Sequence, residues 1–305
     1  MAGLMMLWQP ILQGVLQGRQ NFLWLGWVSM FNGVGRVGIS GIFVWLLHQL
    51  GQRAVYPNKP GELLTESPNG WWAAGIMAGT LLGLVALVAT AAYQIRDLWK
   101  AERLPFDSRD WLKRVIPLTF GAGAGLFLLS ADVIVVKSSF SNWAPYLFGI
   151  TMAKAIVQFT APLAAVMFPK VVRNATQNQQ SSLLGLTLLG TLVLSGMAAI
   201  ALPIVAPFAI KFGSRPEYKT ILPLIPLFAW AMVPLSMGNV LLNNLMARSR
   251  FGVVPWLVLI SAGYWFSLLR FHDSFGQVVQ VFGIFNTLML ITCVAFTWGG
   301  KPCRE

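Results

Sequence analysis

The run LFLLSADVIVVKSSF, at residues 126–140, places one aspartate inside a stretch of apolar side chains. Between Leu126 and Val136, Asp132 is the single charged residue, and Lys137 follows directly. A charged side chain at the centre of a membrane-spanning helix costs roughly 2.5–3.5 kcal/mol on insertion scales. We therefore expect this stretch to cross a membrane as a helix in which Asp132 faces other helices, water or a ligand.

The composition of the whole chain supports this interpretation. Of its 305 residues, 56% are hydrophobic and only 10% are charged, whereas a soluble domain carries about 25% charged residues. The sequence therefore predicts an all-α, polytopic membrane helix bundle. The net charge of +12 then reflects Lys and Arg beside membrane spans, because no nucleic-acid-binding motif accompanies it. Cys293 and Cys303 form no metal-binding or disulfide pattern.

Hydropathy divides the chain into about eight spans, because a bilayer core needs roughly 20 apolar residues per helix. The expected spans cover residues 24–47, 71–95, 112–137, 143–169, 183–210, 219–246, 252–270 and 277–298. The stretch 4–17 is apolar but too short to span a bilayer. We interpret it as the end of a helix whose beginning is missing.

The charged loops predict how these spans are oriented. A cytoplasmic N-terminus places 13 Lys and Arg residues on the cytoplasmic side and 7 on the other side. The positive-inside rule then predicts a multi-pass protein of the inner (cytoplasmic) membrane with both termini in the cytoplasm. The one long charged stretch, residues 96–111, contains Trp99 and Trp111. We interpret it as an amphipathic cytoplasmic linker between two spans and six.

Arg36 lies near the middle of the first expected span, on a polar stripe of that helix. Asn32 and Ser40 lie one helical turn before and after it, so the three side chains share one face. A guanidinium group suits phosphate, because its planar fork can bond two oxygens at once.

Lys154 lies near the middle of the fourth expected span, with Gln158 one turn further on. An uncharged stripe in the sixth span contains Asn239 and Asn243. Two cations and one acid at membrane depth suggest a polar cavity of net positive charge, which would suit an anionic cargo. Structural alternatives stay open: the cations pair with Asp132, and the asparagines join helices by hydrogen bonds.

Several stretches resemble one family of transporters. The segments LLSADVIVVKSSF and APYLFGITMAKAIVQFTAPLAAVMFPKVVR, the second with a turn at Phe168, Pro169 and Lys170, are similar to the first two helices of the C-terminal lobe in polysaccharide-type flippases. These flippases belong to the multidrug/oligosaccharidyl-lipid/polysaccharide exporter superfamily. The segment ILQGVLQGRQNFLWLGWVSMFNGVGRV resembles their fourth-to-fifth helix connection, and IPLFAWAMVPLSMGNVLLNNLMARSRF resembles their tenth helix.

The resemblance implies two six-helix lobes around a central cleft that opens alternately to the two sides of the membrane. Residues 24–95 would be the last two helices of the N-terminal lobe, 96–111 the interlobe linker, and 112–305 the complete six-helix C-terminal lobe. Residues 1–23 would be the remnant of a preceding helix and its cytoplasmic connection. Helices one to three and most of four would be absent, so a second chain that supplies them is an expected partner.

The function that the resemblance implies is the flipping of a lipid-linked oligosaccharide, a polyprenyl-diphosphate glycan, for polysaccharide or lipopolysaccharide biosynthesis. In that role Arg36 and Lys154 attract the diphosphate, while Asp132 tunes the cavity or couples an ion. The other expected substrate-binding residues are amides of the polar stripes: Asn32, Gln158, Asn239 and Asn243. No catalytic residue, metal, cofactor or nucleic acid is expected.

Three other functions stay open at this point. A multidrug exporter of the same superfamily would share the fold, and a non-transporting fragment or a scaffold of a polysaccharide biosynthesis complex would not need a complete cleft. A membrane-embedded glycosyltransferase or ligase would need acids in a sizeable outer loop, and the loop 51–70 offers only Glu62 and Glu66. Because no nucleophile–base pair or metal cluster is visible, the chain is not expected to be an enzyme.

Overall fold

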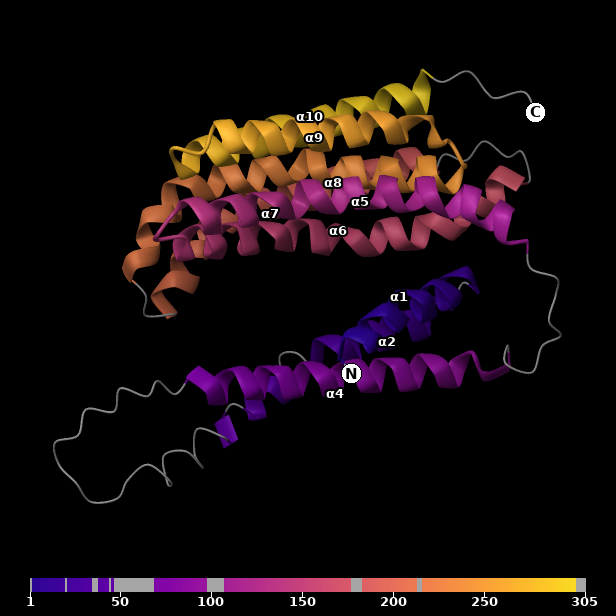
Figure 1. The fold of residues 1–305 in the computed structure, drawn as a ribbon, viewed down its shortest axis with the longest axis horizontal. Helices are drawn as coiled ribbons and strands as arrows, with labels where there is room; N and C mark the ends of the chain where they lie inside the picture. The colour runs from indigo at the N-terminus through magenta and orange to yellow at the C-terminus, as the bar shows by residue number, and fades with distance from the viewer. Residues whose placement is uncertain are drawn as a thin grey trace. The chain divides into compact units, whose positions relative to one another are not determined.

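The computed structural model describes residues 2–19, 21–34, 38–43, 45–46, 69–97, 107–176, 183–212 and 216–299. These residues form helices joined by short turns, and no β-strand occurs among them (Figure 1). The all-α fold class expected from the sequence is confirmed.

Six helices in the described part are long and apolar enough to cross a membrane. They lie at Gly75–Gln94, Ser108–Ser139, Leu184–Lys211, Lys219–Ala247, Phe251–Arg270 and Phe275–Trp298. The expected span at 143–169 is also a helix, and the expected span at 24–47 is helical at residues 24–34, 38–43 and 45–46. The chain is therefore a multi-pass membrane protein.

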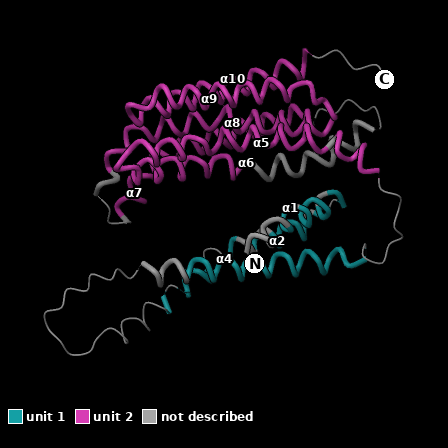
Figure 2. Tube along the Cα trace, viewed as in Figure 1, with its two compact units in different colours: residues 1–105 teal, residues 106–305 magenta. Residues whose placement is uncertain are grey.

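The chain divides into two compact units, Met1–Pro105 and Phe106–Glu305 (Figure 2). The division falls within the charged stretch 96–111. Each unit has a hydrophobic core of its own.

The first unit contains α1 (Ala2–Gly18), α2 (Phe22–Val34) and α4 (Asn69–Gln94). Apolar side chains of these three helices, and Ile95 directly after α4, meet in a small core: Leu12, Leu16, Val28, Leu87, Ala91 and Ile95.

A short helical run at residues 38–43 lies against α4 in the first unit. The Ser40 hydroxyl donates a hydrogen bond to the backbone carbonyl of Ile76 over 3.3 Å. One turn further along α4, a Cβ on Gly79 would lie 2.5 Å from the Cα of Ser40. This close backbone approach requires glycine, which has no Cβ.

The second unit is built from six long helices among its described residues. They are α5 (Ser108–Ser139), α6 (Ala144–Thr176), α7 (Leu183–Phe212), α8 (Ile225–Ala247), α9 (Val254–Arg270) and α10 (Phe275–Trp298). Two 3₁₀ turns, η3 (Pro216–Leu224) and η4 (Phe251–Val253), lead into α8 and α9. The helices correspond to the six spans expected from residue 112 onward, although α6 continues to Thr176 and the first residues of the span expected at 219–246 form η3, with α8 starting at Ile225.

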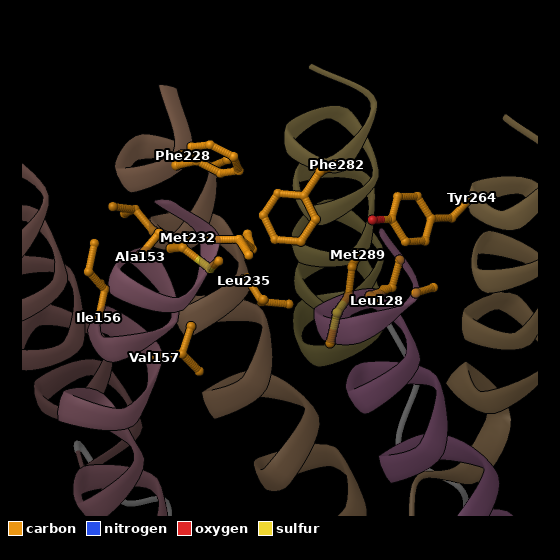
Figure 3. Packing of buried hydrophobic residues seen from close by; sticks show 14 of the residues in the cluster. Leu128, Ala153, Ile156, Val157, Phe228, Met232, Leu235, Tyr264, Phe282 and Met289 are labelled. Carbon is orange, nitrogen blue, oxygen red and sulfur yellow. The ribbon is translucent and has the colours of Figure 1, made fainter. Parts of the chain in front are cut away.

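Helix α8 forms the centre of the second unit. It packs against α6, α7 and α10, and most of its residues are buried. Figure 3 shows Phe228, Met232 and Leu235 of this helix among core side chains of α6 and α10. A Cβ on Gly238 would lie 3.7 Å from the backbone of Leu290, so a small residue lets α8 and α10 approach closely. A largely apolar helix is expected at such a buried position, and its buried polar side chains are Ser236 and Asn244.

Several hydroxyl side chains within the spans bond to their own helix. The hydroxyls of Thr119, Thr191 and Thr292 donate to the carbonyl four residues earlier at 2.9, 2.8 and 2.9 Å. Ser236 and Thr287 do the same at 2.9 and 2.8 Å. Each hydroxyl is thereby satisfied without a partner from another helix.

Helix α5 begins at Ser108, earlier than the expected 112, because Asp107 caps it. The Asp107 carboxylate accepts hydrogen bonds from the backbone N–H groups of Arg109 (2.9 Å) and Asp110 (3.3 Å). These are among the N–H groups that a helix start leaves without an intrahelical acceptor.

Replacement of Asp107 by alanine should loosen the first turn of α5. Loss of an N-cap costs about 1 kcal/mol, which corresponds to about fivefold faster hydrogen–deuterium exchange at the capped amides. The first turn of α10, where Ser274 accepts from the N–H of Gln277, serves as an internal control that stays unchanged. Equal exchange in wild type and variant at Arg109 and Asp110 would contradict the cap.

Candidate functional site

Asp132 lies on α5 in the interior of the second unit. Its side chain is fully buried, and the hydroxyl of Tyr146 on α6 donates a hydrogen bond to its Oδ2 over 2.8 Å. Helix α5 ends at Ser139 and α6 begins at Ala144, so the acid and its donor come from consecutive helices. Asp132 therefore faces the interior of the bundle and not its outer surface.

The ring of Tyr146 is held by two phenylalanines. Its centroid lies 5.2 Å from that of Phe228 in an edge-to-face arrangement and 5.5 Å from that of Phe275. Such aromatic pairs contribute about 0.5–1.5 kcal/mol each beyond the area that they bury. The packing thus fixes the direction in which the hydroxyl meets Asp132.

Lys154 lies about two turns further along α6 and is partly buried. It interacts electrostatically with Asp132. Within the described part of the chain, the one direct ion pair joins Lys113 and Asp110, so Lys154 and Asp132 attract each other without contact. The ammonium group of Lys154 therefore keeps its hydrogen-bond donors.

Tyr264 on α9 is the third fully buried polar side chain of this cluster, which we define as Asp132, Tyr146, Lys154 and Tyr264. Tyr264 lies near Asp132 in the core of the second unit. Its hydroxyl points from α9 into the core, on the side of Phe282 (Figure 3). This hydroxyl oxygen and the Oδ1 of Asp132 have no hydrogen-bond partner among the described residues.

Unsatisfied buried polar atoms are rare in folded proteins, so two of them in one cluster point to a site that takes up a further group. The cluster combines a carboxyl oxygen with a free acceptor position, a phenol hydroxyl and a partly exposed ammonium group. Chemically, such a set can take up a proton or a cation at the carboxyl group and an anion at the ammonium group.

The structure also shows a polar contact that the sequence analysis did not predict. Asn286 on α10 is fully buried, and its Nδ2 donates to the backbone carbonyl of Ala231 on α8 over 3.1 Å. Ala231 follows Trp230, whose carbonyl lacks its helical donor because Pro234, four residues further on, has no N–H. A single asparagine within the apolar run GIFNTLML, at residues 283–290, was the available sequence signal.

Among the described residues, no side-chain hydrogen bond joins the other expected site residues of the second unit to Lys154 or Asp132. Gln158, one turn beyond Lys154, is exposed. Asn243 donates from Nδ2 to the carbonyl of Asn239 over 2.8 Å, within its own helix. Asn239 turns its amide oxygen towards α5, 3.4 Å from the position that a Cβ on Gly125 would take.

Two expected residues belong to the first unit. Arg36 lies outside the described residues. Asn32 belongs to α2, and its side chain lies outside the described part as well. The candidate site is therefore built from the second unit alone.

Within the described ranges, no group of three His, Cys, Asp or Glu side chains is placed to hold a metal ion. Cys293 is a buried free cysteine. No protein-family model, no curated protein and no solved structure matches the chain. The chemistry of the buried cluster is thus the basis for any inference about function.

Proposed function

We propose that this chain is a transporter of the polysaccharide-flippase type, which moves an anionic lipid-linked oligosaccharide across the membrane by alternating access. The observation that carries the proposal is the Asp132–Tyr146 pair with Lys154 beside it, inside a bundle of apolar spans. Ionisable residues at membrane depth are costly and usually mark the path of a substrate or an ion.

Lys154 attracts the diphosphate group of the cargo. Because it is partly buried, its charge acts through a medium less polar than water, which strengthens its attraction for an anion. Its donors are not used in a direct ion pair with Asp132, so they can bond to phosphate oxygens. Arg36 has the same role in the first unit, on the sequence pattern alone.

Asp132 balances the charge of Lys154 while no cargo is bound. Tyr146 holds one carboxyl oxygen in place, and the other oxygen, Oδ1, is left to accept a coupling proton or cation. Uptake of such an ion would weaken the attraction between Asp132 and Lys154 and leave the lysine more strongly positive toward the cargo. In this way one buried pair links ion binding to cargo binding.

Replacement of Lys154 by glutamine should slow the flipping of a polyprenyl-diphosphate oligosaccharide in proteoliposomes about tenfold or more. The reason is the loss of a charged hydrogen bond, which contributes about 1.5–3 kcal/mol. The matched control is Lys113→Gln, which removes an exposed lysine paired with Asp110 and should leave the rate unchanged.

Equal flipping rates for wild type and Lys154→Gln would contradict the role of this lysine. Absence of flipping by the wild-type chain would contradict the proposed function itself. Transport of cationic or neutral drugs without glycan flipping would assign the chain to multidrug export instead.

A further inference from the structure

The surface of the second unit carries an apolar groove between α8 and α10. Its volume is about 540 Å³, within the range of about 300–1,000 Å³ that is usual for small-molecule sites. One wall runs from Leu227 to Pro234 on α8, and the other runs from Val279 to Leu288 on α10. The side chains that border the groove are almost all apolar.

The groove exists because small residues separate larger ones on both walls. A Cβ on Gly283 would lie 3.4 Å from the Cβ of Ala231, so these two residues form a floor without bulky side chains. Trp230 and Ile284 stand beside this floor and are 54% and 57% exposed. A flexible apolar chain fits between such walls.

A second, smaller hollow of about 310 Å³ adjoins the groove between α9 and α10. The two hollows share Gln280 and Ile284. Its polar members, Ser267, Gln277 and Gln280, lie near the start of α10 and the end of α9. Apart from Thr287, the polar side chains of the two hollows are thus gathered at one end of them.

The depth of the groove matches one leaflet of a bilayer. Helix α10 begins at Phe275, and an α-helix rises 1.5 Å per residue, so the wall from Val279 to Leu288 lies about 6–20 Å below the start of the helix. One half of a hydrocarbon core roughly 30 Å thick is about 15 Å deep. The groove therefore has the position and the length that suit one lipid chain.

The same end of the bundle carries a net positive charge, although the acids Glu217 and Asp273 lie there as well. Helices α5, α7 and α9 all end where α10 begins (Figure 1), and each carries a cation in its last turn: Lys137, Lys211 and Arg270. The guanidinium carbon of Arg270 lies 6.0 Å from the ring centroid of Phe271, a residue that borders the smaller hollow. A Lys or Arg at the surface of a leaflet that contains anionic lipids attracts them by about 1 kcal/mol.

We propose that this groove binds an acyl chain of an anionic phospholipid whose phosphate lies at the basic end, near Arg270. The apolar walls, the depth and the cations complement the three parts of such a lipid. The inference does not depend on the proposed transport function, because it concerns a different surface of the second unit.

Native mass spectrometry of the full-length chain, purified in detergent and incubated with phosphatidylglycerol or phosphatidylcholine, tests the proposal. We expect Thr287→Trp, which fills the groove, to lower the affinity for phosphatidylglycerol at least fivefold. The matched control is Thr119→Trp on α5, because Thr119 is also exposed and makes the same bond to the carbonyl four residues earlier. This control should retain wild-type lipid binding.

The role of the charge is tested separately. Arg270→Gln should lower the preference for phosphatidylglycerol over phosphatidylcholine about fivefold. Arg109→Gln, an exposed arginine in the first turn of α5, is its control and should leave the preference unchanged.

Three results would overturn the inference. One is binding of phosphatidylglycerol by Thr287→Trp that equals the wild type. Another is an equal affinity of the wild type for both lipids. The third is a dimer that Thr287→Trp dissociates while lipid binding is unaltered, which would assign the groove to a second copy of the chain.

Discussion

Replacement of Gly79 by alanine should cost the first unit about 3 kcal/mol or more of its stability, at the upper end of what overpacking costs. The new Cβ would meet the hydroxyl, the backbone nitrogen and the Cα of Ser40, the last at 2.5 Å. Two of these three atoms belong to the backbone, so no change of side-chain rotamer relieves the clash. The helical run at 38–43 would have to move away from α4.

An unfolding titration in mixed detergent micelles, followed by far-UV circular dichroism, would measure this loss. Hydrogen exchange of the α4 amides would show that it arises in the first unit. The control is Gly14→Ala on α1, where a Cβ meets nothing within 4 Å. Because alanine is favoured over glycine inside a helix by about 0.5–1 kcal/mol, this variant should be as stable as the wild type or more stable. Equal stability of the two variants would contradict the contact between Ser40 and Gly79.

Replacement of Tyr146 by alanine should destabilise the second unit by about 3–5 kcal/mol, the usual cost of deleting a large buried aromatic ring. The variant removes the contacts with Phe228 and Phe275 and leaves a cavity in the core. It also removes the one side-chain donor that the described residues offer to Asp132.

Tyr146→Phe separates the hydroxyl from the ring. This variant keeps the aromatic contacts but leaves the Oδ2 of Asp132 without its donor, which costs about 1–3 kcal/mol for a buried acceptor. A double-mutant cycle with Asp132→Asn should show a coupling of about 0.5–3 kcal/mol, because the two side chains share one hydrogen bond.

Tyr264→Phe is the matched control for the hydroxyl deletion. Tyr264 is also fully buried, but its hydroxyl has no partner among the described residues, so its loss should leave stability unchanged or slightly raise it. All variants can be compared by the same detergent titration. A Tyr146→Phe variant as stable as Tyr264→Phe would show that the bond to Asp132 contributes nothing.

The helices could be predicted from the sequence because apolar runs of about 20 residues have few other uses. The ends of the helices could be predicted less well, because hydropathy marks the residues that lie in the membrane and a helix can extend beyond them. Helix α5 illustrates the difference: its first residues are charged, yet the Asp107 cap makes them helical. Such a start depends on a local hydrogen bond that an average over many residues does not detect.

The candidate site could be predicted only in part. Asp132 and Lys154 were noticeable as charges within apolar runs. Their aromatic neighbours, Tyr146 and Tyr264, were not predicted, because which faces of α5, α6 and α9 meet depends on packing and not on the sequence of any one helix. Tyrosines near the ends of spans also commonly lie at the membrane interface, which conceals a buried role.

The threonine and serine hydroxyls that bond within their own helices have a consequence for biosynthesis. On α7, the hydroxyls of Thr191 and Ser195 are satisfied within the helix, so neither of them hinders this span from entering the bilayer singly as it leaves the translocation machinery. Asp132 differs, because its donor lies on the following helix. With only a short turn at residues 140–143 between them, α5 and α6 can insert as one hairpin, in which the carboxyl group is already paired when it leaves water.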